Sequence, residues 1–138
     1  MISFFTCLGG AVERVSTKIV TMEILEKAYF ESIKQGRMNS DCYIDDPVGV
    51  IQVYAKLMGV KMHAVFCYKW YKGGKKGLYV SDCAPNFFVS HFMLTDKGDG
   101  HFVETTGAGS VVFDPYPNNI NSKHGEIKSV RCFYVRAG

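Results

Sequence analysis

The spacing of apolar residues changes near Gly59, and this change most restricts the folds open to the chain. Residues 16–35 carry apolar side chains at steps of three and four, which predicts an amphipathic helix. A second helix is predicted over residues 47–58, with Asp45 or Asp46 as its N-cap and Gly59 at its C-terminal end. The first part of the chain is therefore expected to be helical.

After Gly59 the pattern is typical of strands separated by glycine-rich turns. The loops KGGKKG and DKGDG have the composition of hairpin connections. The predicted strands cover residues 61–71, 78–82, 87–95, 101–106, 110–114 and 127–135. Helices followed by an antiparallel sheet of five or six strands predict an α+β fold.

Residues 1–15 fit no single pattern, and they are read either as a strand and turn or as an N-terminal arm that pairs with the sheet edge. The chain has 138 residues, of which 47% are hydrophobic, and no segment is long enough to act as a linker. This size and composition suit one hydrophobic core. We expect a single domain over residues 1–138.

Charge and cysteine content argue against several classes of protein. A net charge of +3 is small for a nucleic-acid-binding domain. The five cysteines form no CxxC pair and are odd in number, so neither a disulfide framework nor a zinc ribbon is indicated. There is no signal-peptide pattern and no run of about 18 apolar residues. We expect a cytoplasmic protein with no metal, no cofactor and no membrane partner.

Cys42, His101 and Asp114 follow one another in the order that a cysteine hydrolase needs. A thiol is a weak nucleophile at neutral pH, so an imidazolium and a helix N-terminus must stabilise its thiolate. A carboxylate or amide must then hold the imidazole in one orientation. His101 starts a strand at the mouth of a loop and Asp114 ends the next strand, so the two side chains can meet if those strands are neighbours.

A simple hairpin closed by DKGDG would place Thr95 opposite His101 and His91 opposite Thr105. In this register His91 and His101 share one face of the sheet, because side chains alternate along a strand. Glu104 would point to the other face, so it is not expected to orient the His101 ring.

Two stretches of the chain resemble papain-like peptidases of the C39-like group. GHFVETTGAGSVVFDPYP, residues 100–117, is similar to the segment of that group that runs from its histidine to its aspartate. NSDCYIDDPVGVIQVYAKLMGV, residues 39–60, is similar to its Asp-Cys and following helix. In length and layout the chain also resembles small proteins of unknown function from spirochaetes and their phage-like elements.

The resemblance implies a papain-like fold and a peptidase or amidase that attacks a peptide or amide substrate. It implies that Cys42 is the nucleophile, His101 the general base and Asp114 the orienting carboxylate. It also implies an oxyanion-hole donor upstream of the thiol, either Gln35 or Asn39.

The residues after Cys42 depart from that pattern. Pro47 suits a helix that begins at Pro47 better than one that begins at Cys42, because a proline inside a helix clashes with the carbonyl four residues earlier. Asp45 and Asp46 would raise the pKa of the nearby thiol. The alternative is a non-catalytic protein on the same scaffold, phage-encoded, that binds a partner.

The densest cluster of basic and aromatic residues lies in the hairpin at residues 68–76. Such a hairpin can contact a protein partner or track a phosphate backbone, but a lysine-rich tip more often protects a sheet edge from aggregation. Nucleic acid is therefore the less favoured partner. The residues expected to bind a partner are Lys69, Trp70, Lys72, Lys75 and Lys76.

Overall fold

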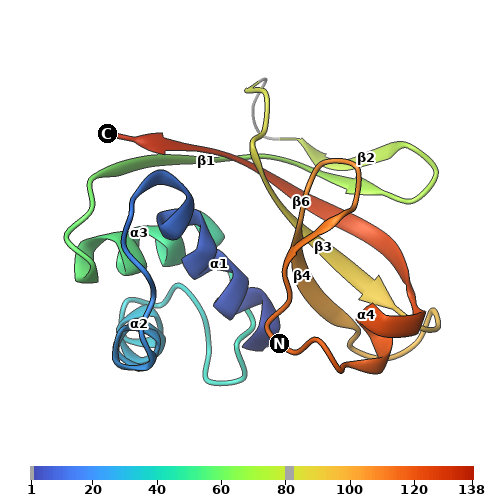
Figure 1. The fold of residues 1–138 in the computed structure, drawn as a ribbon, viewed down its shortest axis with the longest axis horizontal. Helices are drawn as coiled ribbons and strands as arrows, with labels where there is room; N and C mark the ends of the chain where they lie inside the picture. Colours follow the sequence, from blue (N-terminus) through green and yellow to red (C-terminus); the bar gives the residue numbers. More distant parts are fainter. Residues whose placement is uncertain (1, 80–82) are drawn as a thin grey trace.

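Figure 1 shows the computed structural model of the chain, which describes residues 2–79 and 83–138. Three helices come first: α1 (Ile2–Val15), α2 (Met22–Lys34) and α3 (Pro47–Leu57). The remaining elements are β1 (Met62–Tyr71), β2 (Lys75–Tyr79), β3 (Phe87–Met93), β4 (His101–Thr105), β5 (Val111–Phe113), α4 (Ile120–His124) and β6 (Glu126–Ala137). The predicted α+β fold is confirmed, with the N-terminal helices packed on the sheet.

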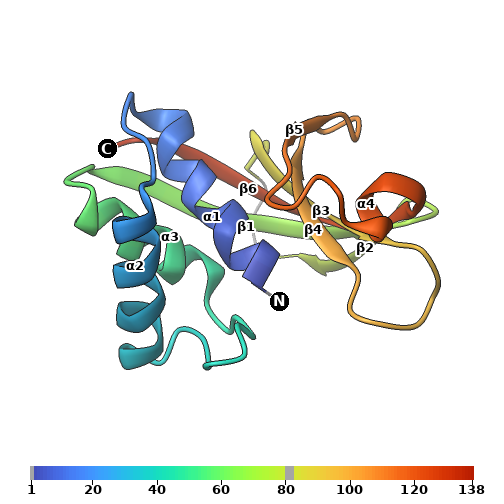
Figure 2. The same ribbon diagram turned by 60° about the horizontal axis from the view of Figure 1, so that its bottom comes forward.

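Within the described ranges, six strands form one antiparallel sheet in the order β2-β1-β6-β3-β4-β5. The last strand of the chain, β6, lies between β1 and β3, so the C-terminal segment joins the two halves of the sheet. In Figure 2, α1, α2 and α3 gather at one end of the molecule, and β5 and α4 lie at the other.

Residues 2–15 form a helix, not the strand or arm that the sequence allowed. Helix α1 packs against α3 and β4, and nine of its residues are buried. Two glycines permit this close packing: a Cβ at Gly9 would lie 3.0 Å from Cε1 of Tyr54, and one at Gly10 would lie 2.7 Å from Oε1 of Glu104. Burial of an apolar face therefore outweighs the weak helix propensity of a glycine pair.

The starts of α2 and α3 follow from their capping residues. The hydroxyl of Thr21 accepts a hydrogen bond from the backbone N–H of Ile24, so α2 begins later than the sequence pattern predicted. Asp46 caps α3 by accepting a hydrogen bond from the N–H of Gly49 at 2.9 Å, and Pro47 occupies the first turn. The predicted N-cap and start of α3 are confirmed.

The hydrophobic core lies between the helices and one face of the sheet. Its largest fully buried side chains include Phe5, Tyr54, Phe87 and Phe133, which come from α1, α3, β3 and β6. The Tyr54 hydroxyl donates a hydrogen bond to the Phe5 carbonyl at 3.0 Å, which ties α3 to α1. Among the described residues, no helix has the length and apolarity needed to cross a membrane.

The β3–β4 pairing differs from the hairpin register expected from the sequence. His91 lies opposite Phe102 instead of Thr105, and Phe92 lies opposite His101. This is a shift of three residues, and an odd shift moves a side chain to the other face. The expectation that His91 and His101 share a face is therefore wrong.

A wide loop explains the shifted register. Strand β3 ends at Met93, and the chain returns only at His101. The ring of His91 lies 2.7 Å from the carbonyl oxygen of Asp99, and Gly100 follows with a φ of 66°. The loop is therefore held by a side chain from the strand and by a left-handed glycine at its end.

Candidate functional site

His101 and Asp114 form a buried pair. Nε2 of His101 lies 2.6 Å from Oδ1 of Asp114, and His101 is only 2% exposed. The contact forms because β4 and β5 are neighbours in the sheet and Asp114 directly follows β5. Asp114 also accepts a hydrogen bond from the backbone N–H of Tyr116 at 2.9 Å. The carboxylate is thus held where it can fix the orientation of the imidazole.

The surroundings of Asp114 stabilise its charged form. Burial raises the pKa of Asp114, but hydrogen bonds from His101, the Tyr116 N–H and Ser122 outweigh this effect, so the pKa lies below its ordinary value of 3.8. A carboxyl group of this kind adds stability above its unfolded-state pKa, and the contribution disappears as the pH falls through the folded-state pKa.

We therefore expect Asp114→Asn to lower the free energy of unfolding by about 1–3 kcal/mol at neutral pH, because a hydrogen bond to a charged group is lost. The difference from the wild type should shrink in acid below about pH 4. Urea unfolding across this pH range measures it. Asp96→Asn is the control, since the Asp96 side chain is 90% exposed; an equal effect of both changes would contradict the role of the buried pair.

Cys42 lies in the loop between α2 and α3, not at a helix N-terminus. Its φ is +62°, and its N–H donates a hydrogen bond to the Asn39 carbonyl at 3.0 Å. The residue is 4% exposed, and burial raises the pKa of its thiol. Asp41 adds to this increase. Both effects favour the protonated thiol, which is the unreactive form.

The structure brings His101 to Asp114, but it does not bring Cys42 to His101. No hydrogen bond joins the Cys42 sulfur to the imidazole within the described part of the chain. Phe102 lines the same pocket as Cys42. Because successive strand residues point to opposite faces, His101 points away from that pocket.

Gln35 and Asn39 serve the structure around Cys42. The Gln35 amide donates to Glu31 at 2.9 Å and accepts from Arg37 at 2.8 Å, at the C-terminal end of α2. The Asn39 side-chain oxygen accepts hydrogen bonds from the backbone N–H groups of Asp41 and Tyr43, at 2.9 and 3.0 Å. The Asn39 bonds hold the turn that carries Cys42, whereas the Gln35 bonds join the end of α2 to Arg37.

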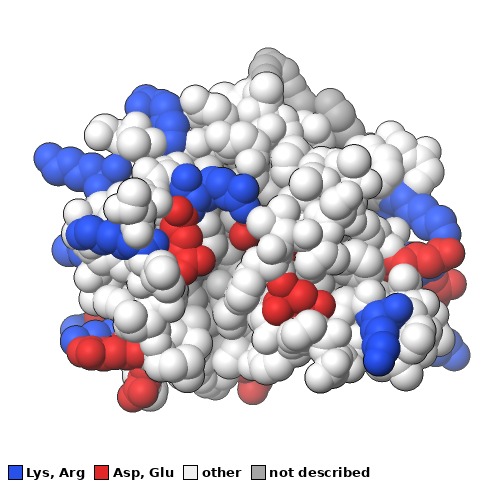
Figure 3. Space-filling view, in the orientation of Figure 1, with Lys and Arg blue, Asp and Glu red and all other residues white. Residues whose placement is uncertain are grey.

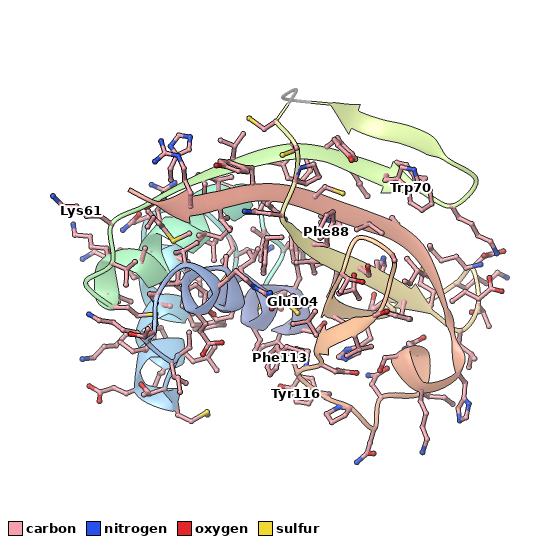
Figure 4. All side chains as sticks on the ribbon, turned by 45° about the horizontal axis from the view of Figure 1, so that its top comes forward. Lys61, Trp70, Phe88, Glu104, Phe113 and Tyr116 are labelled. Carbon is pink, nitrogen blue, oxygen red and sulfur yellow. The ribbon has the colours of Figure 1, made fainter. Side chains whose placement is uncertain are left out.

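The basic and aromatic hairpin residues do not form one surface. Lys69 lines the pocket beside Cys42. Trp70, which lies toward the hairpin end of β1 (Figure 4), lines a smaller cavity with Phe88, of about 170 Å³. Lys72 is paired with Glu126 at 2.5 Å. The side chains of Lys75 and Lys76 lie outside the described part of the structure. On the face shown in Figure 3, basic and acidic side chains are interspersed.

The pocket beside Cys42 has a volume of about 480 Å³ and is formed by the α2–α3 loop, α1 and the sheet. Its walls are mostly apolar and aromatic, with Phe4, Phe66 and Phe102 among them. Polar groups come from Asp45 and Asp46 on the loop and from two basic residues on the sheet. The complete lining is Phe4, Cys42, Tyr43, Ile44, Asp45, Asp46, Pro47, Val48, Phe66, Lys69, Phe102 and Arg131.

Arg131 and its aromatic neighbours were not predicted from the sequence. The guanidinium carbon of Arg131 lies 5.0 Å from the ring centre of Phe4 and 4.9 Å from that of Phe102. A sequence signal for Arg131 existed, because this charged residue interrupts the apolar run of the last strand. Phe4 carried no signal, since α1 itself was not recognised.

Together, the fold and this pocket define a small α+β protein with helices on one face of an antiparallel sheet and a cavity of ligand size between them. The chain belongs to the family described as protein of unknown function, DUF261, which it matches over residues 2–135. No curated protein and no solved structure matches it.

Proposed function

We propose that this protein is a binding protein whose ligand occupies the pocket beside Cys42. The observation that carries the proposal is the pocket itself. Its volume of about 480 Å³ falls within the usual range for small-molecule sites, and its walls are largely apolar with a few polar groups. A non-catalytic binding protein was the alternative that the sequence offered if Cys42 is not activated. The proposed contact surface differs, because it is the pocket and not the hairpin at residues 68–76.

The state of Cys42 supports binding over catalysis. Its thiol is buried, its pKa is raised, and no imidazole bonds to it among the described residues. Activation of a cysteine requires the reverse, namely a lowered pKa beside a cation or a helix N-terminus. On this proposal Cys42 is a small apolar part of the pocket wall.

A papain-like cysteine hydrolase is the second candidate, and the His101–Asp114 bond favours it. The carboxylate holds Nε2, which leaves Nδ1 to act as a base toward a thiol. In this proposal, the Cys42 thiolate attacks the amide carbonyl, and the C–N bond breaks as the His101 imidazolium protonates the leaving amine. Water then hydrolyses the thioester, which releases the carboxylic acid and restores the thiol. It requires the loop that carries Cys42 to move to the His101 side of the sheet.

Alkylation by iodoacetamide, followed residue by residue with mass spectrometry, separates the two functions. The binding proposal predicts that at about pH 6 Cys42 reacts no faster than the exposed Cys83, and that His101→Ala leaves this order unchanged. Cys83 is the internal control, because it is the exposed cysteine of the five. Rapid alkylation of Cys42 that disappears in His101→Ala would overturn the binding proposal and establish the hydrolase.

A further inference from the structure

One guanidinium nitrogen of Arg131 is buried without a hydrogen-bond partner among the described residues. This nitrogen is Nη1, and it is shielded from solvent. The guanidinium group contacts the faces of Phe4 and Phe102, which attract a cation but accept no conventional hydrogen bond. Buried polar atoms in folded proteins are nearly always paired, and an unpaired one calls for an explanation.

A second cation lies directly opposite. Lys69 on β1 pairs with Arg131 on β6, and both residues line the pocket. Like charges placed opposite each other in a sheet destabilise it. The Lys69 ammonium contacts the Tyr71 ring at 4.8 Å, and no ion pair to Lys69 or Arg131 is found among the described residues.

The acidic residues of the pocket do not neutralise this pair. Asp46 is occupied by an ion pair with Arg37 and by the cap of α3. Asp45 belongs to the same loop, and it forms no ion pair with either cation within the described ranges. The sheet side of the pocket is therefore positively charged and lies beside aromatic rings.

We infer that the pocket binds a small organic anion, with a carboxylate or phosphate held by Arg131 and Lys69 and an apolar body held against Phe4 and Phe66. This inference rests on the proposed binding function and names the class of ligand. A guanidinium matches the two oxygens of either anion in a bidentate contact. Such a contact would lie between the two like charges of Arg131 and Lys69 and weaken their repulsion. The pocket volume of about 480 Å³ suits a small molecule.

His91 provides a built-in reporter of the anion. Its ring stacks on Phe102 with 4.2 Å between ring centres and 3° between planes. Burial lowers the pKa of His91 most, the Asp99 contacts oppose this, and the Arg131 and Lys69 charges lower it further. An anion beside these two cations weakens their effect, so its binding should raise the pKa of His91.

The test compares phenylacetate and phenyl phosphate with neutral phenylacetamide, which has the same ring. Backbone amide shifts in NMR titrations give the affinities. Both anions should bind at least about tenfold more tightly than the amide, and added salt should weaken this preference. Arg131→Met should abolish the preference. Arg136→Met is the matched control, because this arginine lies on the same strand, is exposed and does not line the pocket.

The outcomes separate this inference from the proposed function. Equal binding of all three probes in the pocket would contradict the inferred preference for anions, but the proposed binding function would stand. Failure of every probe to shift the pocket amides would overturn both. If Arg131→Met does not fold, the pKa of His91 in the wild type decides: an unchanged value at saturating phenylacetate or phenyl phosphate contradicts the inference, and a rise supports it.

Discussion

Replacing Phe102 by alanine is expected to lower the free energy of unfolding by about 3–5 kcal/mol, the range typical of removing a buried aromatic side chain. Phe102 is 1% exposed and lies between two stacked rings, Phe4 at 4.9 Å and His91 at 4.2 Å. The alanine would leave a cavity beneath α1 and remove one of the two rings that face Arg131. Urea unfolding at neutral pH measures the loss.

Phe113→Ala is the matched control for this change. It removes the same side chain from the neighbouring strand β5, where Phe113 is 43% exposed. The loss in unfolding free energy should be well below that of Phe102→Ala, because folding buries less of the apolar surface of Phe113. Similar losses for the two variants would show that the stack of Phe4, Phe102 and His91 is not a central part of the core.

The ion pair between Arg14 and Glu104 is expected to give the second large effect. Figure 4 shows Glu104 of β4 beside α1. Its side chain is 4% exposed, whereas the Arg14 side chain is 41% exposed. Arg14→Met leaves a buried carboxylate without its cation. We expect a loss of about 2–4 kcal/mol, somewhat below the full cost of breaking a wholly buried pair, since solvent screens Arg14.

A second substitution identifies the origin of this loss. In Arg14→Met combined with Glu104→Gln, the buried charge is gone, so much of the stability should return. Lys27→Met breaks the exposed Glu23–Lys27 pair of α2 and should leave stability nearly unchanged. The explanation fails if the double variant, measured by urea unfolding, is as unstable as Arg14→Met.

The Arg14–Glu104 pair also shows why contacts made by α1 could not be predicted from the sequence. Glu104 was expected to point away from His101, and its pairing with Arg14 on α1 agrees with that expectation. Its partner could not be predicted, because residues 2–15 had not been recognised as a helix. Two glycines lower the helix propensity of this segment, and its helical form depends on burial against α3 and β4.

Local chemistry was enough for the elements whose ends are set by their own residues. The Asp46–Pro47 start of α3 is set by a side-chain cap and a fixed φ, both of which act within one turn. The division into helices and strands follows from the period of apolar residues, which is also local. The His101–Asp114 contact followed from the order of two neighbouring strands.

Contacts between distant segments determined the rest. The wide loop after Met93 shifts the pairing of His91 by three residues, and this odd shift moves His91 to the face opposite His101. The pocket requires α1, the Cys42 loop and the middle of the sheet to meet, and it brings Arg131 into contact with the rings of Phe4 and Phe102. Periodicity shows which face of each element is apolar, but the partner of that face depends on packing among segments far apart in the chain.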